Sequence, residues 1–99
     1  MNRADEQWVH TLYTENAQKM FRIAAWRLGD EDAAHNAVQE VFLALLEKLE
    51  DVKKHPNPEG WLMKALRIAI YRELDARKLR MTHETAIDEL YRRESAAPA

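Results

Sequence analysis

The 99-residue sequence has no cysteine, two glycines and three prolines, and it has no long run of apolar residues. Without cysteine the chain can form neither a disulfide nor a thiolate metal site. Its apolar runs are far shorter than the roughly 20 residues of a membrane span, and its first residues lack the apolar stretch of a signal peptide. The sequence therefore predicts a soluble, cytoplasmic, single-domain protein with no membrane contact.

Catalytic arrangements are also missing from the sequence. No two of its four histidines are four residues apart, and it has neither a glycine-rich phosphate loop nor a nucleophile elbow. The carboxylates at Asp30, Glu31 and Asp32 stand where the start of a helix favours negative charge. We therefore expect no enzyme activity, no metal site and no cofactor.

Charge is present but unevenly distributed along the chain. The formal net charge is only −2, yet residues 30–50 hold six acidic and one basic residue, and residues 61–80 hold six basic and two acidic ones. Neighbouring segments of opposite charge favour different partners. The two segments are therefore candidates for two separate binding surfaces.

Helix breakers divide the chain into an all-α pattern. Helices are expected from about Ala4 or Asp5 to Leu28, from about Glu31 to Leu49 and from Pro58, through Trp61 and Leu62, to about Arg80. These predict a compact three-helix domain over residues 1–80. Residues 81–99 are expected to form a linker or tail that holds a short fourth helix between Glu84 and Arg93.

Local signals predict where these helices begin and end. Gly29 should end the first helix in a left-handed conformation, and Asp30 should cap the second. A break in the first helix is considered near Thr14 to Asn16. Residues 51–58 are expected to form a loop because of Pro56 and Pro58, with Asn57 capping the third helix and Pro58 in its first position.

The second helix has the clearest apolar arc and a polar stripe opposite to it. Its predicted core residues are Ala34, Val38, Val41, Phe42, Leu45, Leu46 and Leu49. The opposite stripe holds Asn36, Gln39, Glu40, Leu43 and Glu47. Two interpretations stay open for this stripe: a solvated face with one exposed leucine, or a protein interface with an apolar anchor and a polar rim.

The third helix places cations and aromatic rings at helical spacing. Lys64, Arg67, Tyr71 and Lys78 share one face, and Trp61 lies at the start. Cations suit a phosphate backbone and rings suit unstacked bases, so this face is a candidate nucleic-acid surface. Equally, Trp61 could belong to the core while the cations solvate the helix.

Three stretches together resemble a known family. Val38-Gln39-Glu40-Val41-Phe42, the Trp61-Leu62 pair that opens the next helix and the Gly29-Asp30 turn are similar to regions 2.1 to 2.4 of bacterial RNA polymerase sigma factors of the extracytoplasmic-function class. The resemblance spans nearly the whole chain. It implies the region 2 domain of a transcription initiation factor.

The resemblance also implies partners and site residues. The clamp helices of the polymerase β′ subunit would bind Asn36, Gln39, Glu40, Leu43 and Glu47. The non-template strand of the promoter −10 element would be captured, with bases flipped out, by the loop and the third helix. The DNA-binding residues are then Lys53, Lys54, Asn57, Trp61, Lys64, Arg67, Tyr71, Arg77 and Lys78.

The sequence departs from the family pattern at three positions. Members of the family usually have an acidic residue at the position that Asn36 occupies in this chain. They commonly have an asparagine at the position of Ile68 and an aspartate at the position of Arg72. The changes at Ile68 and Arg72 leave a second hypothesis open: a sigma-like interaction module that engages an anti-sigma factor as a decoy and does not read promoters. An anti-sigma factor is a candidate partner in either case, and the resemblance leaves the −35-reading region 4 outside this chain.

Overall fold

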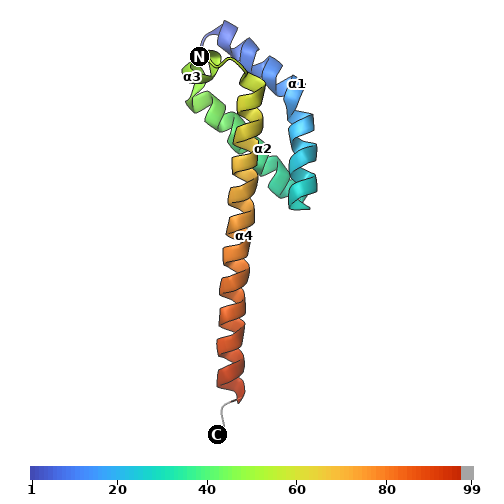
Figure 1. The fold of residues 1–99 in the computed structure, drawn as a ribbon, viewed down its shortest axis with the longest axis vertical. Helices are drawn as coiled ribbons and strands as arrows, with labels where there is room; N and C mark the ends of the chain where they lie inside the picture. Colours follow the sequence, from blue (N-terminus) through green and yellow to red (C-terminus); the bar gives the residue numbers. More distant parts are fainter. Residues whose placement is uncertain (97–99) are drawn as a thin grey trace.

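The computed structural model describes residues 1–96 and confirms the all-α prediction. Over these residues the chain forms four helices and no strand: α1 (Arg3–Leu28), α2 (Glu31–Glu47), α3 (Leu49–Lys53) and α4 (Pro58–Ala96). In Figure 1, α2 runs back along α1 toward the N-terminus, and α4 crosses α2, with α1 beside it, before it extends beyond both helices. The chain therefore has a helical body and one long projecting helix.

Helix α1 is continuous, so the break considered near Thr14 to Asn16 does not occur. Side chains in this stretch do bond to carbonyls one turn earlier: Thr14 Oγ1 donates to His10 O at 3.0 Å, and Asn16 Nδ2 donates to Leu12 O at 2.9 Å. Bonds of this kind often bend a helix without ending it. Figure 1 shows α1 bending about midway along its length.

The joint between α1 and α2 forms as its residues predict. Gly29 has φ +63°, and its N–H donates to Ala25 O at 2.8 Å. Asp30 Oδ1 then accepts from the N–H groups of Asp32 at 2.9 Å and Ala33 at 3.3 Å. Both caps satisfy backbone groups that a helix end leaves unpaired, so the chain reverses within two residues.

The core lies where α1, α2 and α4 meet, and most of the predicted arc of α2 faces it. Leu46 is the exception, being 43% exposed, and Leu49 is only half-buried at the start of α3. Leu46 lies at the edge of the arc, where a small rotation of α2 decides between core and solvent. The buried apolar residues of α2 are Ala34, Ala37, Val38, Val41, Phe42 and Leu45.

The predicted loop from Asp51 to Pro58 is partly wrong, because Asp51 to Lys53 belong to α3. A proline lacks an N–H donor and restricts only the residue directly before it, so Pro56 leaves a helix that ends at Lys53 undisturbed. Val52 is 1% exposed and anchors this turn in the core. The loop proper is therefore limited to residues 54–57.

Helix α4 starts as predicted and runs further than predicted. Asn57 Oδ1 accepts from the N–H of Gly60 at 3.0 Å, and Pro58 is the first helical residue. The expected separate helix between Glu84 and Arg93 is instead a continuation of α4 to Ala96, since no glycine or proline interrupts the chain after Gly60 until Pro98. The division into a domain over residues 1–80 and a linker or tail over 81–99, of which 97–99 lie outside the described residues, stays a prediction.

The long α4 also changes the expected shape. The molecule measures 72 × 23 × 21 Å, with a radius of gyration of 19.6 Å, whereas a compact chain of this length has about 13 Å. Figure 1 shows why: the first part of α4 packs on α1 and α2, and the rest projects alone. Compactness therefore holds for the helical body that carries the candidate sites.

Candidate functional site

The polar stripe of α2 is fully presented to solvent. All five predicted residues are exposed, and the apolar Leu43 in the middle is 59% exposed. The arrangement follows from the packing, since Val38, Val41 and Leu45 bury the opposite side of the same helix. We call Asn36, Gln39, Glu40, Leu43 and Glu47 the α2 stripe.

An apolar groove of about 770 Å³ lies between α1 and α2, along one side of the stripe. Gln39 and Leu43 of the stripe line it, and so does Leu46, which the sequence pattern assigned to the core. Two aromatic pairs form its walls: Tyr13 packs edge-on against Phe42 with ring centres 5.0 Å apart, and Phe21 stacks on His35 at 4.3 Å.

Sequence reasoning missed the α1 side of this groove. Tyr13 and Phe21 are apolar residues of an amphipathic helix, and no spacing rule separates a core residue from a groove residue at the edge of the apolar face. The sequence signal that could have revealed the groove is the width of the apolar arc. A helix that has more apolar side chains than its neighbours can cover leaves some of these side chains exposed. The α2 stripe therefore has an aromatic border that the sequence did not reveal.

Two further hollows border the α2 stripe on its other side, between α2 and α4. One, of about 480 Å³, holds Asn36, Glu40, Leu43 and Glu47 opposite Arg72. The other, of about 530 Å³, lies closer to the α3–α4 loop, and its polar and aromatic lining residues are Glu40, Glu47, Lys48, His55, Trp61, Lys64 and Arg72. Acidic and basic side chains line both hollows, which lie side by side between α2 and α4 and share Glu40, Glu47 and Arg72. We call the two hollows together the α2–α4 groove.

The loop residues at this groove have structural contacts. His55 Nδ1 accepts from the N–H of Asn57 at 2.9 Å, and the Asn57 side chain caps α4. Lys53 donates to Asp5 Oδ1 at 2.9 Å and lies 3.4 Å from Glu50, and the hydrogen bond to Asp5 is the main cause that raises the pKa of Lys53 above 10.5. Lys53 therefore joins α3 to α1, Asn57 caps α4, and the predicted DNA contacts of both residues stay untested.

The remaining predicted DNA residues differ in exposure. Trp61 is half-buried against the core, and Tyr71 is 53% exposed. The exposed cations are Lys54, Lys64, Arg67 and Lys78. Since Lys64, Arg67, Tyr71 and Lys78 share one face of α4 by helical spacing, the structure keeps them together on one side of an unbroken helix.

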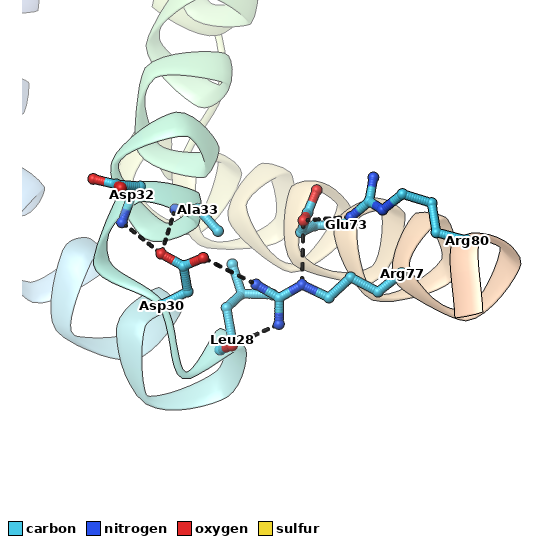
Figure 2. A network of polar contacts seen from close by, with 7 residues as sticks. All are labelled: Leu28, Asp30, Asp32, Ala33, Glu73, Arg77 and Arg80. Atoms are coloured by element: carbon cyan, nitrogen blue, oxygen red, sulfur yellow. Dashed lines mark hydrogen bonds and ion pairs between the residues drawn. The ribbon is translucent and has the colours of Figure 1, made fainter. Parts of the chain in front are cut away.

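Arg77 has a different position from the other predicted DNA residues. Its guanidinium donates from Nη1 to Leu28 O at 2.6 Å and from Nε to Glu73 Oε1 at 3.2 Å, and its Nη2 lies 3.9 Å from Asp30. Figure 2 shows this side chain reaching from α4 to the turn that joins α1 and α2. Arg77 thus ties the three long helices together.

Helix α1 contributes a neighbour that sequence reasoning missed. The Arg27 guanidinium carbon lies 5.5 Å from the ring centre of Tyr71, in a cation–π contact between α1 and α4. The sequence pattern of a single helix cannot predict such a pair, because the two residues are 44 positions apart and meet only through the packing of α1 on α4. The basic face of α4 therefore continues onto α1.

Residues 1–96 contain neither a metal-binding cluster nor a membrane-spanning helix. No group of three or more His, Asp or Glu side chains is arranged there to hold a metal ion. None of the helices in this part of the chain has the length and apolar character needed to cross a bilayer.

Comparison with known proteins identifies the family. No curated protein and no solved structure matches the chain. The family model described as Sigma-70 region 2 matches residues 12–80, which include α1 from Leu12 onward, α2, α3 and the first part of α4. Domains of this family are non-enzymatic transcription factors that in general bind core RNA polymerase and recognise the promoter −10 element. Because the match covers well over half of the chain, the protein belongs to the sigma-70 region 2 family.

Proposed function

We propose that the chain is the region 2 domain of an extracytoplasmic-function sigma factor and acts in the cytoplasm. In this proposal the α2 stripe docks on the clamp helices of the polymerase β′ subunit, and the α3–α4 loop with α4 captures the non-template strand of the −10 element. The observation that carries it is the α2 stripe, an exposed row of polar side chains around Leu43 that is bordered by a groove on each side.

The stripe suits a helical partner. Leu43 offers an apolar anchor, and Gln39 and Glu40 beside it offer a hydrogen-bonding rim, which is the usual composition of a protein interface centre. The grooves on either side give room for side chains of a partner helix, and the α1–α2 groove adds exposed apolar surface at Leu46 and Tyr13. Packing into both grooves would fix the rotation of the partner about α2.

The α2–α4 groove suits an unstacked base. His55 and Trp61 supply flat rings at its lining, and Lys64 supplies a cation that can contact the phosphate on the same strand. The loop that leads into it is ordered by the His55 to Asn57 hydrogen bond and by the Asn57 cap. A flipped base would therefore enter a prepared site at low ordering cost.

A second function, the anti-sigma decoy without promoter binding, is favoured by one observation. Ile68 and Arg72, which differ from the usual family residues, both line this same α2–α4 groove. If they block base entry, the α2 stripe would still bind its protein partner. Direct binding of −10 single-stranded DNA separates the two functions, because only the initiation factor requires it.

The docking proposal is tested by capture of core RNA polymerase on the immobilised full chain. Glu40→Lys should abolish capture, since it places a cation in an acidic and polar rim, and Leu43→Ala should weaken it less. Glu15→Lys is the matched control, because it makes the same charge change at an exposed position of α1. Equal capture by Glu40→Lys and the control would show that the α2 stripe is not the docking surface.

The DNA proposal is tested by the salt dependence of binding to the −10 non-template strand in the assembled holoenzyme. Lys64→Ala and Lys78→Ala should each reduce the slope of log K against log salt by about 0.7, the value for one phosphate of a single strand. Tyr71→Ala should alter which base is accepted. Unchanged promoter opening after Lys64, Arg67 and Lys78 are all replaced by Ala would favour the decoy function.

A further inference from the structure

An apolar row continues along α4 after the helix leaves the body of the molecule (Figure 1). Up to Ala76, one side of α4 lines the α2–α4 groove. Leu79, Ala86, Ile87 and Leu90 then fall within about 100° of the helix circumference, on the same side as Ala76. All four are exposed. We call these four residues the α4 row, an apolar surface that the rest of the described chain leaves uncovered.

The chain cannot cover the α4 row by folding α4 back on itself. Helix α4 is continuous from Pro58 to Ala96, and the sequence has no glycine or proline between Gly60 and Pro98. Sharp reversals and kinks of helices depend on such residues, so α4 has no hinge near the row. The body formed by α1 and α2 packs only on the first part of α4 (Figure 1). A cover for the row therefore has to come from outside residues 1–96.

The spacing of the row is that of a seam between two helices. Leu79 and Ala86 are seven residues apart, and His83 and Leu90 stand at the alternate positions, which together give the a and d pattern of a coiled coil. A second copy of α4 running antiparallel would place its Leu90 opposite Leu79 and its Ala86 opposite His83. Both ends of the seam then have a leucine pair, and the small Ala86 leaves room for the imidazole. The row is therefore complementary to itself, as a two-fold symmetric interface requires.

Charges beside the row favour the same antiparallel arrangement. Lys78 and Glu89 are exposed and lie on one flank of the seam by helical spacing. Two-fold symmetry brings the same flank of both helices together, so each Lys78 would lie close to Glu89 of the other copy. A parallel pair would separate the two charges by about 17 Å along the axis. Arg80, on the other flank, already lies 3.4 Å from Glu73 of its own helix.

We propose that the projecting part of α4 pairs antiparallel with α4 of a second copy of this chain, through the α4 row and His83, with a Lys78–Glu89 ion pair at each end. The seam covers about three helical turns, which is less than a standard stable interface, and the polar His83 weakens it further. The dimer is therefore weak and forms only at raised concentration. It involves neither the α2 stripe nor a nucleic acid, so it does not depend on the proposed function.

Sedimentation equilibrium of the full chain, from low to high micromolar concentration, tests the pairing. The average mass of the parent should rise toward that of a dimer. Leu79→Ser should weaken dimerisation by at least about 10-fold, because each dimer loses two leucine pairs, and His83→Leu should strengthen it. Met81→Ser is the matched control: Met81 is 67% exposed and Leu79 72%, but Met81 lies on the opposite side of α4. This control should dimerise as the parent does.

Charge reversal tests the antiparallel register. Lys78→Glu and Glu89→Lys should each weaken dimerisation by at least about 2-fold, because two exposed ion pairs are lost per dimer, and the double variant should restore it. A parent that stays monomeric at every concentration, equal dimerisation by Leu79→Ser and Met81→Ser, or a double variant as weak as the single ones would each overturn the proposal. All substituted side chains are exposed, so each variant should keep the circular dichroism melting curve that the parent has at low concentration.

Discussion

Arg77 should stabilise the fold more than the other cations of α4 between Lys64 and Arg80. Its guanidinium donates to Leu28 O, a carbonyl at the C-terminal end of α1, where a helix end leaves acceptors unpaired and favours positive charge. The same group bonds Glu73 on α4 and lies near Asp30, which caps α2 (Figure 2). Removing the side chain would therefore loosen α1, α2 and α4 at one point.

The expected loss can be worked out from these contacts. A hydrogen bond from a charged donor contributes about 1.5–3 kcal/mol. The ion pairs with Glu73 and Asp30 add little, about 0.5 kcal/mol, because the partners are one-third to one-half exposed. We expect Arg77→Ala to lower the free energy of unfolding by about 2 kcal/mol, which corresponds to roughly 8–16 °C in melting temperature. Arg77→Lys keeps the charge and loses the planar fork, so it should cost about half as much.

Urea unfolding followed by circular dichroism at 222 nm measures this loss. Lys78→Ala is the matched control, because Lys78 is the exposed cation next in sequence, and its unfolding free energy should stay within about 0.5 kcal/mol of the parent. An Arg77→Ala variant that unfolds at the same urea concentration as Lys78→Ala would refute the reasoning. In the same variants, a salt slope for DNA binding that changes only in Lys78→Ala would show that Arg77 acts through the fold.

Three further predictions concern the core, the α1–α2 turn and the α1–α3 contact. Phe42→Ala should lower the free energy of unfolding by about 3–5 kcal/mol, since its buried ring also contacts Tyr13; a urea-measured cost below about 1 kcal/mol would mean that its packing is misassigned. Gly29→Ala should cost about 1–2 kcal/mol, because φ is +63° there, and an unchanged melting temperature would contradict it. Lys53 has a raised pKa, so its bridge to Asp5 should stabilise the fold below pH 10.5 and lose that effect as pH rises through the folded-state pKa. The difference in urea midpoint between the parent and Lys53→Met should shrink above that pH, and a constant difference up to pH 12 would rule the bridge out.

The parts of the fold that the sequence predicted correctly depend on local chemistry. Gly29, Asp30 and Asn57 act on backbone groups within four residues, so their roles could be assigned without the tertiary structure. The burial of most of the apolar arc of α2 is also predicted locally, because it follows from the helical spacing of the apolar residues within this one helix. The α2 stripe could be located for the same reason, as the side opposite the arc.

The features that were mispredicted or missed depend on how helices pack. Whether Leu46 is buried depends on the rotation of α2 against α1, and the helical state of residues 51–53 depends on a place in the core for Val52. The Arg77 contact to Leu28 spans 49 residues, and the Arg27 contact to Tyr71 joins two helices. No periodicity within one helix carries information about such pairs.

The charge of residues 61–80 illustrates the consequence for function. Six cations were counted there as one basic footprint, but Arg77 and Arg80 both lie within 3.4 Å of Glu73. Arg72 faces the acidic α2 stripe across the α2–α4 groove. Of the other three cations, Lys64 lines the loop end of the same groove, and Arg67 and Lys78 are exposed. Three phosphate contacts give only weak single-strand binding at physiological salt. A strand held by α4 alone would therefore depend on the polymerase for its affinity.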